Sequence, residues 1–268
     1  MIRDDDMVPG SDREEVVAGG AECISTQPLP DGRGSVLTSP GDTAQGRISI
    51  VIPTLNEAEH LRGTLDGLRQ ADVYEIIVAD GGSGDETADI ALACGATVVR
   101  CERGRGMQFN AGAAAAGGEI LLFLHADTSL PAGFEACVRE MLERPGVSAG
   151  AFSLRIDGAR RSYRVIERLV AWRSRFLGLP YGDQALFMTD ETFQAVGRYP
   201  EFAAMEDFEL VRRLRRIGQI AIAIEQVVTS ARRWSKRGVL RTTALNAACV
   251  AAYLCGVSPQ RIASWRCG

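Results

Sequence analysis

The chain has 268 residues, which is enough for one large α/β domain with extensions. An apolar fraction of 46% and a charged fraction of 24% are ordinary for a soluble globular protein. None of the seven cysteines forms a CxxC pair, which argues against zinc and thiol-redox motifs.

The net charge of −4 conceals two oppositely charged segments. Residues 1–46 hold nine acidic and three basic side chains and are rich in Gly, Ser and Pro, so we expect a disordered extension there. Residues 212–241 hold nine basic side chains and one acid, Glu225. That balance indicates either an anionic partner or solvated helix faces.

One ordered domain is predicted over residues 47–268, with strands and helices in alternation. Short apolar runs predict buried strands at 48–52, 75–79, 96–100 and 119–124. Helical periodicity predicts helices between these strands, at 57–70, 85–94 and 106–116. This order predicts an α/β fold, with a mostly parallel, doubly wound sheet and helices on both faces.

The second half of the domain is less regular. We expect strands near 148–155 and 220–224, and helices near 160–176, 206–217 and 239–255.

Candidate ligand-binding residues, most of them polar, follow each of the first four predicted strands. They are Pro53, Thr54, Asn56 and Glu57; Asp80 and Gly81; Arg105, Gln108 and Asn110; and His125, Ala126 and Asp127. The carboxyl ends of parallel strands share one edge of a sheet, where ligands bind in open α/β folds. We therefore expect a ligand crevice at this edge. Turn and cap chemistry is the alternative, and it accounts well for Ser83, Gly84 and Asp85.

Asp127 is the strongest candidate for a metal ligand. It follows a wholly apolar strand, and a carboxylate there can hold a divalent cation against a nucleotide. The alternative is an N-terminal cap for a helix expected near Pro131.

Known nucleotide motifs match poorly. The pattern GxGxxG would need Thr87 in place of its third glycine, and it follows the second strand instead of the first. The chain has no GxxxxGK[ST] phosphate loop. An aspartyl-phosphate phosphatase needs its nucleophilic aspartate where this chain has His125.

Four motifs together resemble family 2 glycosyltransferases of the GT-A fold. They are the segments 53–57 (PTLNE), 80–85 (DGGSGD), 125–127 (HAD) and 206–207 (ED). The segments 105–113 and 181–184 resemble a bacterial subgroup found beside radical-SAM and selenium-associated genes and linked to arsenosugar biosynthesis. The resemblance covers residues 47–268.

The resemblance implies an inverting transferase that moves a sugar from a nucleotide-diphospho-sugar, such as a UDP- or GDP-sugar, to an acceptor hydroxyl or carboxyl. The twelve strand-end residues would bind this donor, and Asp127 would bind Mg²⁺ or Mn²⁺. His125 stands where the family's Asp-x-Asp motif has its first aspartate. Asp183, Gln184 and Trp234 would line the acceptor side.

The resemblance makes Asp207 the catalytic base, with Glu206 as the alternative. Helical geometry places Asp207 about 30° from the centre of the helix's apolar stripe and Glu206 about 70° from it, so Asp207 should point more directly inward. The competing role for Asp207 is a charge that complements the helix N-terminus.

Two other functions remain open at this point. One is a sugar-1-phosphate nucleotidyltransferase, although that class needs a Gly- and Arg-rich loop where this chain has 53–57. The other is a nucleotide-binding module without catalysis. Nucleic-acid binding is not expected, because the basic segment contains no known nucleic-acid-binding motif.

The C-terminal segment 231–268 is basic and then apolar. Its predicted helix either packs on the catalytic domain or lies on a membrane surface through residues 231–257, near a lipid-linked acceptor. The odd number of cysteines and the lack of a secretory leader predict a cytoplasmic protein, with any membrane contact at the inner face of the cell membrane.

Overall fold

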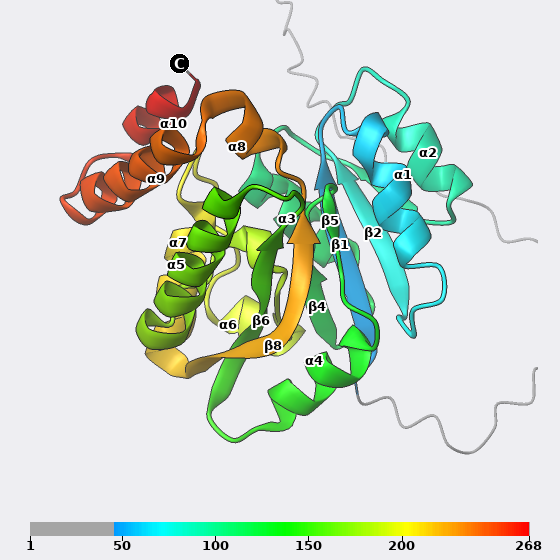
Figure 1. Cartoon of the computed structure of the whole chain (residues 1–268). Helices are drawn as coiled ribbons and strands as arrows, with labels where there is room; N and C mark the ends of the chain where they lie inside the picture. Colours follow the sequence, from blue (N-terminus) through cyan, green and yellow to red (C-terminus); the bar gives the residue numbers. More distant parts are fainter. Residues whose placement is uncertain (1–45, 268) are drawn as a thin grey trace, which may run out of the picture. The chain divides into compact units, whose positions relative to one another are not determined.

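A single mixed sheet of eight strands organises the described part of the chain, in the order β3-β2-β1-β4-β7-β6-β8-β5 (Figure 1). The computed structural model describes residues 46–267, so all but the last residue of the predicted extension lies outside the described residues. Every described residue belongs to one unit, Thr43–Gly268.

The first half of the sheet is parallel, as predicted. Its strands are β1 (Ile48–Thr54), β2 (Glu75–Asp80), β3 (Thr97–Arg100) and β4 (Ile120–Phe123). β1 pairs with β2 on one side and with β4 on the other, both in parallel. The carboxyl ends of these strands therefore lie at one edge, where the sequence predicts the crevice.

The second half of the sheet is mixed. β7 (Leu186–Thr189) runs antiparallel to both β4 and β6 (Val147–Ile156), and β8 (Gln219–Thr229) runs parallel to β6. The two-residue strand β5 (Thr128–Ser129) pairs with β8 in antiparallel fashion. The predicted α/β class and its mostly parallel sheet are confirmed.

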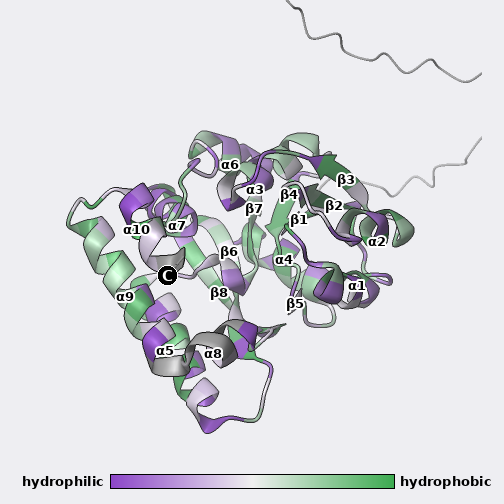
Figure 2. Ribbon diagram, turned by 90° about the horizontal axis from the view of Figure 1, so that it is seen from above, coloured by the Kyte–Doolittle hydropathy of each residue, from purple (hydrophilic) through white to green (hydrophobic). Residues whose placement is uncertain are grey.

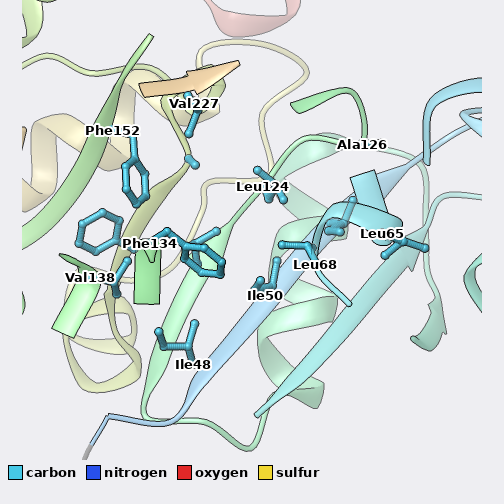
Figure 3. Packing of buried hydrophobic residues seen from close by; sticks show 14 of the residues in the cluster. Ile48, Ile50, Leu65, Leu68, Leu124, Ala126, Phe134, Val138, Phe152 and Val227 are labelled. Atoms are coloured by element: carbon cyan, nitrogen blue, oxygen red, sulfur yellow. The ribbon is translucent and has the colours of Figure 1, made fainter. Parts of the chain in front are cut away.

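Alternating side chains of β1 divide the core into two layers. Ile48, Ile50 and Ile52 join a buried cluster with α1 (Ala58–Gly67), α2 (Thr87–Ala93), α4 (Phe134–Glu143) and α5 (Arg161–Leu177). Val51 joins another cluster with α3 (Arg105–Ala115), α6 (Asp190–Ala195) and α7 (Glu206–Ile217). Figure 3 shows part of the first cluster. Helices therefore cover both faces of the sheet, as predicted.

The C-terminal helices pack on the domain. They are α8 (Arg232–Arg237), α9 (Val239–Leu254) and α10 (Pro259–Cys267), and in both ribbon views α9 and α10 lie on the side away from α1 and α2 (Figures 1 and 2). Cys249 and Ile262 are buried against Met205 and Phe208. Among the described residues, no helix combines the length and apolar character that crossing a membrane requires.

Two details differ from the predictions. β1 continues through Pro53 to Thr54, because β4 pairs with β1 only as far as Val51 and the missing N–H of Pro53 removes no bond to that neighbour. The sequence also misses β5, β7 and α6, which are two to six residues long and too short to show a periodicity.

Helix α3 lies close to β1 because Gly112 has no side chain. A Cβ atom on Gly112 would lie 2.3 Å from a methyl carbon of Val51, which is fully buried. We expect Gly112→Ala to lower the free energy of unfolding by about 1–3 kcal/mol, because the core there has no space for a methyl group. Urea denaturation measures the change.

Gly63→Ala is the matched control for this substitution. Gly63 is exposed within α1, and nothing lies within 4 Å of the position that a methyl group would take there. Alanine there should stabilise the chain by about 0.5–1 kcal/mol through helix propensity alone. Equal effects of both substitutions would show that the close approach of α3 to β1 is not a constraint.

Candidate functional site

Two cavities open beyond the carboxyl ends of β1 and β4. The larger has a volume of about 430 Å³, within the usual range for small-molecule sites. Eight of the predicted donor-binding residues line it: Pro53, Thr54, Glu57, Arg105, Gln108, His125, Ala126 and Asp127. The structure thus brings together residues from all of the strand-end groups except the one after β2.

The smaller cavity, of about 60 Å³, contains the predicted catalytic pair. Glu206 and Asp207 line it from the first turn of α7, and Asp183 lines it from η1 (Gly182–Gln184). Helix α9 supplies another wall with Asn246, Cys249 and Val250, none of which the sequence predicted. Arg105, His125 and Glu206 line both cavities, so the two meet at these three residues.

Arg105 joins the two helices that flank this meeting point. Its guanidinium lies 3.0 Å from Glu206 Oε1 and 3.7 Å from Asp207 Oδ2. Burial alone lowers the pKa of the Arg105 guanidinium, but the charges of Glu206, Asp207 and Asp183 outweigh it and raise that pKa above its usual value. Arg105 is therefore a permanent cation between the two cavities.

Glu206 is more deeply buried than Asp207, contrary to the expectation from helix geometry. The side chain of Glu206 is 5% exposed and that of Asp207 is 16% exposed. The apolar stripe of α7 gave the wrong ranking because this first turn meets Arg105 and Gly182 beyond the sheet edge, where packing does not follow the stripe. Glu206 is thus held by Arg105, and Asp207 is the more accessible carboxylate.

Gly182 makes room for Asp207. A Cβ atom on Gly182 would lie 2.6 Å from Asp207 Oδ2, so the side chain of Asp207 lies directly against the backbone of η1. The neighbouring Asp183 has a buried Oδ1 without a hydrogen-bond partner among the described residues. An unsatisfied acceptor of this kind is suited to receive a hydrogen bond from a ligand hydroxyl.

Arg232 extends from α8 into the larger cavity. Its Nη2 donates a hydrogen bond to Glu57 Oε1 at 2.9 Å and lies 3.5 Å from Asp127 Oδ2. The hydrogen bond to Glu57 raises the pKa of Arg232, with further contributions from the charges of Glu57 and Asp127. Arg232 was not identified from the sequence. The only sequence feature that pointed to a role for it is the cluster of basic residues that begins at Arg232.

Asp127 is the residue best placed to hold a cation. It lines the larger cavity and, together with Asp183, Thr229 and Trp234, a small adjoining pocket. No group of three or more His, Cys, Asp or Glu side chains suited to a metal occurs among the described residues. A cation at Asp127 would therefore need further oxygen ligands from a bound molecule or water, which is the usual manner of Mg²⁺ binding at phosphates.

Hydrogen bonds join the loop after β2 to its own backbone and to the loop after β1. Asp80 is 3% exposed and accepts hydrogen bonds from Ser83 N at 3.1 Å and Thr54 Oγ1 at 3.4 Å. Asn56 has a φ of 54° and accepts a bond from Gly84 N at 2.8 Å. Neither residue lines a cavity described above, so the predicted donor contacts of Asp80, Gly81 and Asn56 stay predictions.

Three predicted ligand contacts are amides that hold the fold together. Gln108 Nε2 donates to the carbonyls of Thr54 at 2.6 Å and Ala79 at 3.1 Å. Asn110 exchanges two hydrogen bonds with the backbone of Tyr199, and Gln184, fully buried, donates to Phe152 O at 2.8 Å. Of these three residues, Gln108 alone lines either of the two cavities described above.

Tyr199, which was not predicted, interacts electrostatically with the predicted catalytic pair. It is 2% exposed, and its ring stacks on Phe109 with 4.8 Å between the ring centres. Burial raises the pKa of Tyr199 well above its usual value, and the negative charges of Asp207 and Glu206 act in the same direction. The environment of the Tyr199 hydroxyl therefore favours its neutral form.

Comparison with known proteins agrees with this architecture. Residues 49–201 match the family described as Glycosyl transferase family 2. A 91-residue stretch is 38% identical to the PGL/p-HBAD biosynthesis glycosyltransferase of Mycobacterium tuberculosis, covering 31% of this chain and 36% of that protein. The chain thus spans about a third of the length of the curated relatives it matches.

Solved structures confirm the GT-A fold. Glucosyl-3-phosphoglycerate synthase from Mycobacterium tuberculosis, in complex with Mn²⁺ and UDP-glucose, is 27% identical, with 70% of each chain covered and a TM-score of 0.52. S. aureus TarS, in complex with UDP-GlcNAc, is 15% identical, with 69% of this chain and 58% of that chain covered and a TM-score of 0.54. The likeness to TarS concerns the fold alone.

The bridging role of Gln108 can be tested by its effect on stability. Gln108→Leu leaves two buried carbonyls without their donor, so we expect the free energy of unfolding to fall by about 1–3 kcal/mol. The control Gln70→Leu makes the same chemical change at an exposed position and should change stability by less than about 0.5 kcal/mol. Urea midpoints compare the two, and an unchanged midpoint for Gln108→Leu would rule out the bridging role.

Proposed function

Because the chain belongs to glycosyl transferase family 2, we propose that it moves a sugar from a nucleotide-diphospho-sugar to an acceptor hydroxyl or carboxyl. The observation that carries this proposal is the meeting of two cavities at Arg105, His125 and Glu206. The larger is lined by the predicted donor-binding residues, and the smaller contains Asp207. A donor in the larger cavity and an acceptor in the smaller one can therefore approach each other where the two cavities meet.

The donor occupies the larger cavity in this proposal. Arg105 and Arg232 supply two cations to that cavity, and a diphosphate is the part of a nucleotide-sugar that such cations bind. Glucosyl-3-phosphoglycerate synthase, which has been solved with UDP-glucose, supports a uridine donor. A GDP-sugar is the alternative to be tested beside it.

A divalent metal fits at Asp127. Its carboxylate lines the cavity beside Arg232, and diphosphate oxygens can complete a set of hard oxygen ligands. The same synthase has been solved with Mn²⁺ or Mg²⁺ and a uridine nucleotide, which supports the choice of these ions. The metal would neutralise negative charge that develops on the departing diphosphate.

Asp207 acts as the base in this mechanism. The acceptor oxygen attacks the anomeric carbon, its proton passes to Asp207, and the bond from that carbon to the diphosphate oxygen breaks. The nucleoside diphosphate leaves from the larger cavity. A single displacement inverts the anomeric configuration. The ion pair with Glu206 keeps Arg105 where the two cavities meet, and Asp183 accepts a hydrogen bond from the acceptor.

The acceptor is bound beside α9. Tyr181, Phe208 and Val250 give the smaller cavity apolar walls, while Asp183 and Asn246 give it polar groups. This mixture fits an acceptor with both apolar and hydroxyl or carboxyl parts. Membership of the arsenosugar-linked subgroup, proposed from segments 105–113 and 181–184, is compatible with such an acceptor.

Asp207→Asn tests the base. We expect the rate of transfer to fall by about 10²–10⁴-fold, because the amide cannot accept the proton, while the affinity for the nucleotide stays within about twofold. Product formation measures the rate, and calorimetry with UDP or GDP measures the affinity. The exposed Asp157 provides the control, since Asp157→Asn should leave both quantities unchanged. Full transfer activity of Asp207→Asn would eliminate this assignment.

Asp127→Ala tests the donor site and the metal together. With Mn²⁺ or Mg²⁺ present, the correct nucleotide-sugar at a hundredfold excess over its Kd should stabilise the wild-type chain by about 2.7 kcal/mol. A thermal-shift panel of UDP- and GDP-sugars measures this, and Asp127→Ala should abolish it while the exposed-site control Asp157→Asn retains it. Stabilisation without metal that survives Asp127→Ala would contradict the metal site. Donor binding without any turnover would favour a nucleotide-binding module.

A further inference from the structure

Helix α5 exposes a stripe of large apolar side chains. Val165, Leu169, Trp172 and Phe176 follow one another at intervals of four, three and four residues, which places them on one face of the helix. Their exposed fractions are 55%, 55%, 56% and 75%. The rings of Trp172 and Phe176 are neighbours, with 6.1 Å between their centres.

A row of arginines runs beside this stripe. Arg161, Arg168 and Arg175 are seven residues apart, and helical geometry places their row about 70° around the helix from the apolar stripe. All three are exposed, and none makes an ion pair within the part of the chain that the structure describes. The sole acid of α5, Glu167, is paired with Arg164 at 3.0 Å. The exposed charge of α5 is therefore entirely positive.

The opposite face of α5 fixes the helix to the domain. Tyr163 and Ile166 are buried in the core. Arg173 donates a hydrogen bond to Leu179 O at 2.9 Å, and its guanidinium lies 3.5 Å from the centre of the Tyr181 ring. In Figures 1 and 2, α5 lies toward the end of the sheet away from α1 and α2. The stripe is thus a rigid part of the surface.

We propose that the outer face of α5 docks on a membrane surface that contains anionic lipid. Aromatic and aliphatic side chains of an amphipathic helix insert at the boundary between headgroups and acyl chains, and neighbouring arginines pair with lipid phosphates. The charge of the row is complementary to such a surface and would be screened by salt. This surface is separate from segment 231–257, for which the sequence predicted membrane contact, and it does not depend on sugar transfer.

Vesicle sedimentation with the full chain tests this surface. We expect the chain to sediment with phosphatidylcholine vesicles that contain phosphatidylglycerol, and to bind about tenfold more weakly to phosphatidylcholine alone or at high salt. The double variants Trp172→Ser/Phe176→Ser and Arg168→Gln/Arg175→Gln should each weaken binding at least about tenfold. Leu92→Ser is the matched control, because Leu92 is 60% exposed on α2 and its loss should have no effect.

Three outcomes would overturn the proposal. They are no binding of the wild-type chain to anionic vesicles, binding that both double variants retain, and a solution dimer that Trp172→Ser/Phe176→Ser dissociates, since the stripe would then join two copies. If a double variant fails to fold, a single variant replaces it, Phe176→Ser for the apolar stripe or Arg175→Gln for the arginine row. Quenching of tryptophan fluorescence by brominated lipid provides a second readout in the variant Trp234→Phe/Trp265→Phe, which keeps only Trp172 of the three tryptophans, and an unquenched signal counts against the proposal.

Discussion

The contact of Arg105 with Glu206 and Asp207 joins the two halves of the sheet at the edge where both cavities lie. Arg105 is the first residue of α3, which packs on the parallel half of the sheet. A positive charge at the N-terminus of a helix interacts unfavourably with the helix dipole. Glu206 and Asp207 begin α7, which packs on β6 and β8, and their charges favour that dipole. Because Glu206 is nearly fully buried, it must keep its cation, so the contact fixes both helix ends.

This contact also separates the roles of two adjacent carboxylates. Glu206 is paired with Arg105, whereas Asp207 lies against Gly182 with more access to the smaller cavity. In the larger cavity Arg232 similarly offsets Glu57 and Asp127. Both cavities therefore contain carboxylates that are accompanied by arginine, which limits the repulsion that a diphosphate would meet there.

The parallel half and its strand-end groups could be predicted because apolar runs and the polar residues after them are local patterns. The roles of Gln108, Asn110 and Gln184 could not be distinguished, because their backbone partners lie 54, 89 and 32 residues away. Arg232 was missed for the same reason, since Glu57 is 175 residues distant. The ranking of Asp207 over Glu206 in burial failed because a periodic stripe describes packing on the sheet and not contacts beyond its edge.

Helix α9 contributes three residues to the smaller cavity and none of the residues that line the larger one. It is attached through a separate small cluster around Phe208 and Cys249 and through a hydrogen bond from Tyr253 to Glu209 at 2.9 Å. Replacing Asn246 or Val250 therefore reshapes one cavity and leaves the walls of the other in place. In evolutionary terms the two cavities are modular: duplicated copies of this fold can diverge in the ligand of the smaller cavity while inheriting the larger one unchanged.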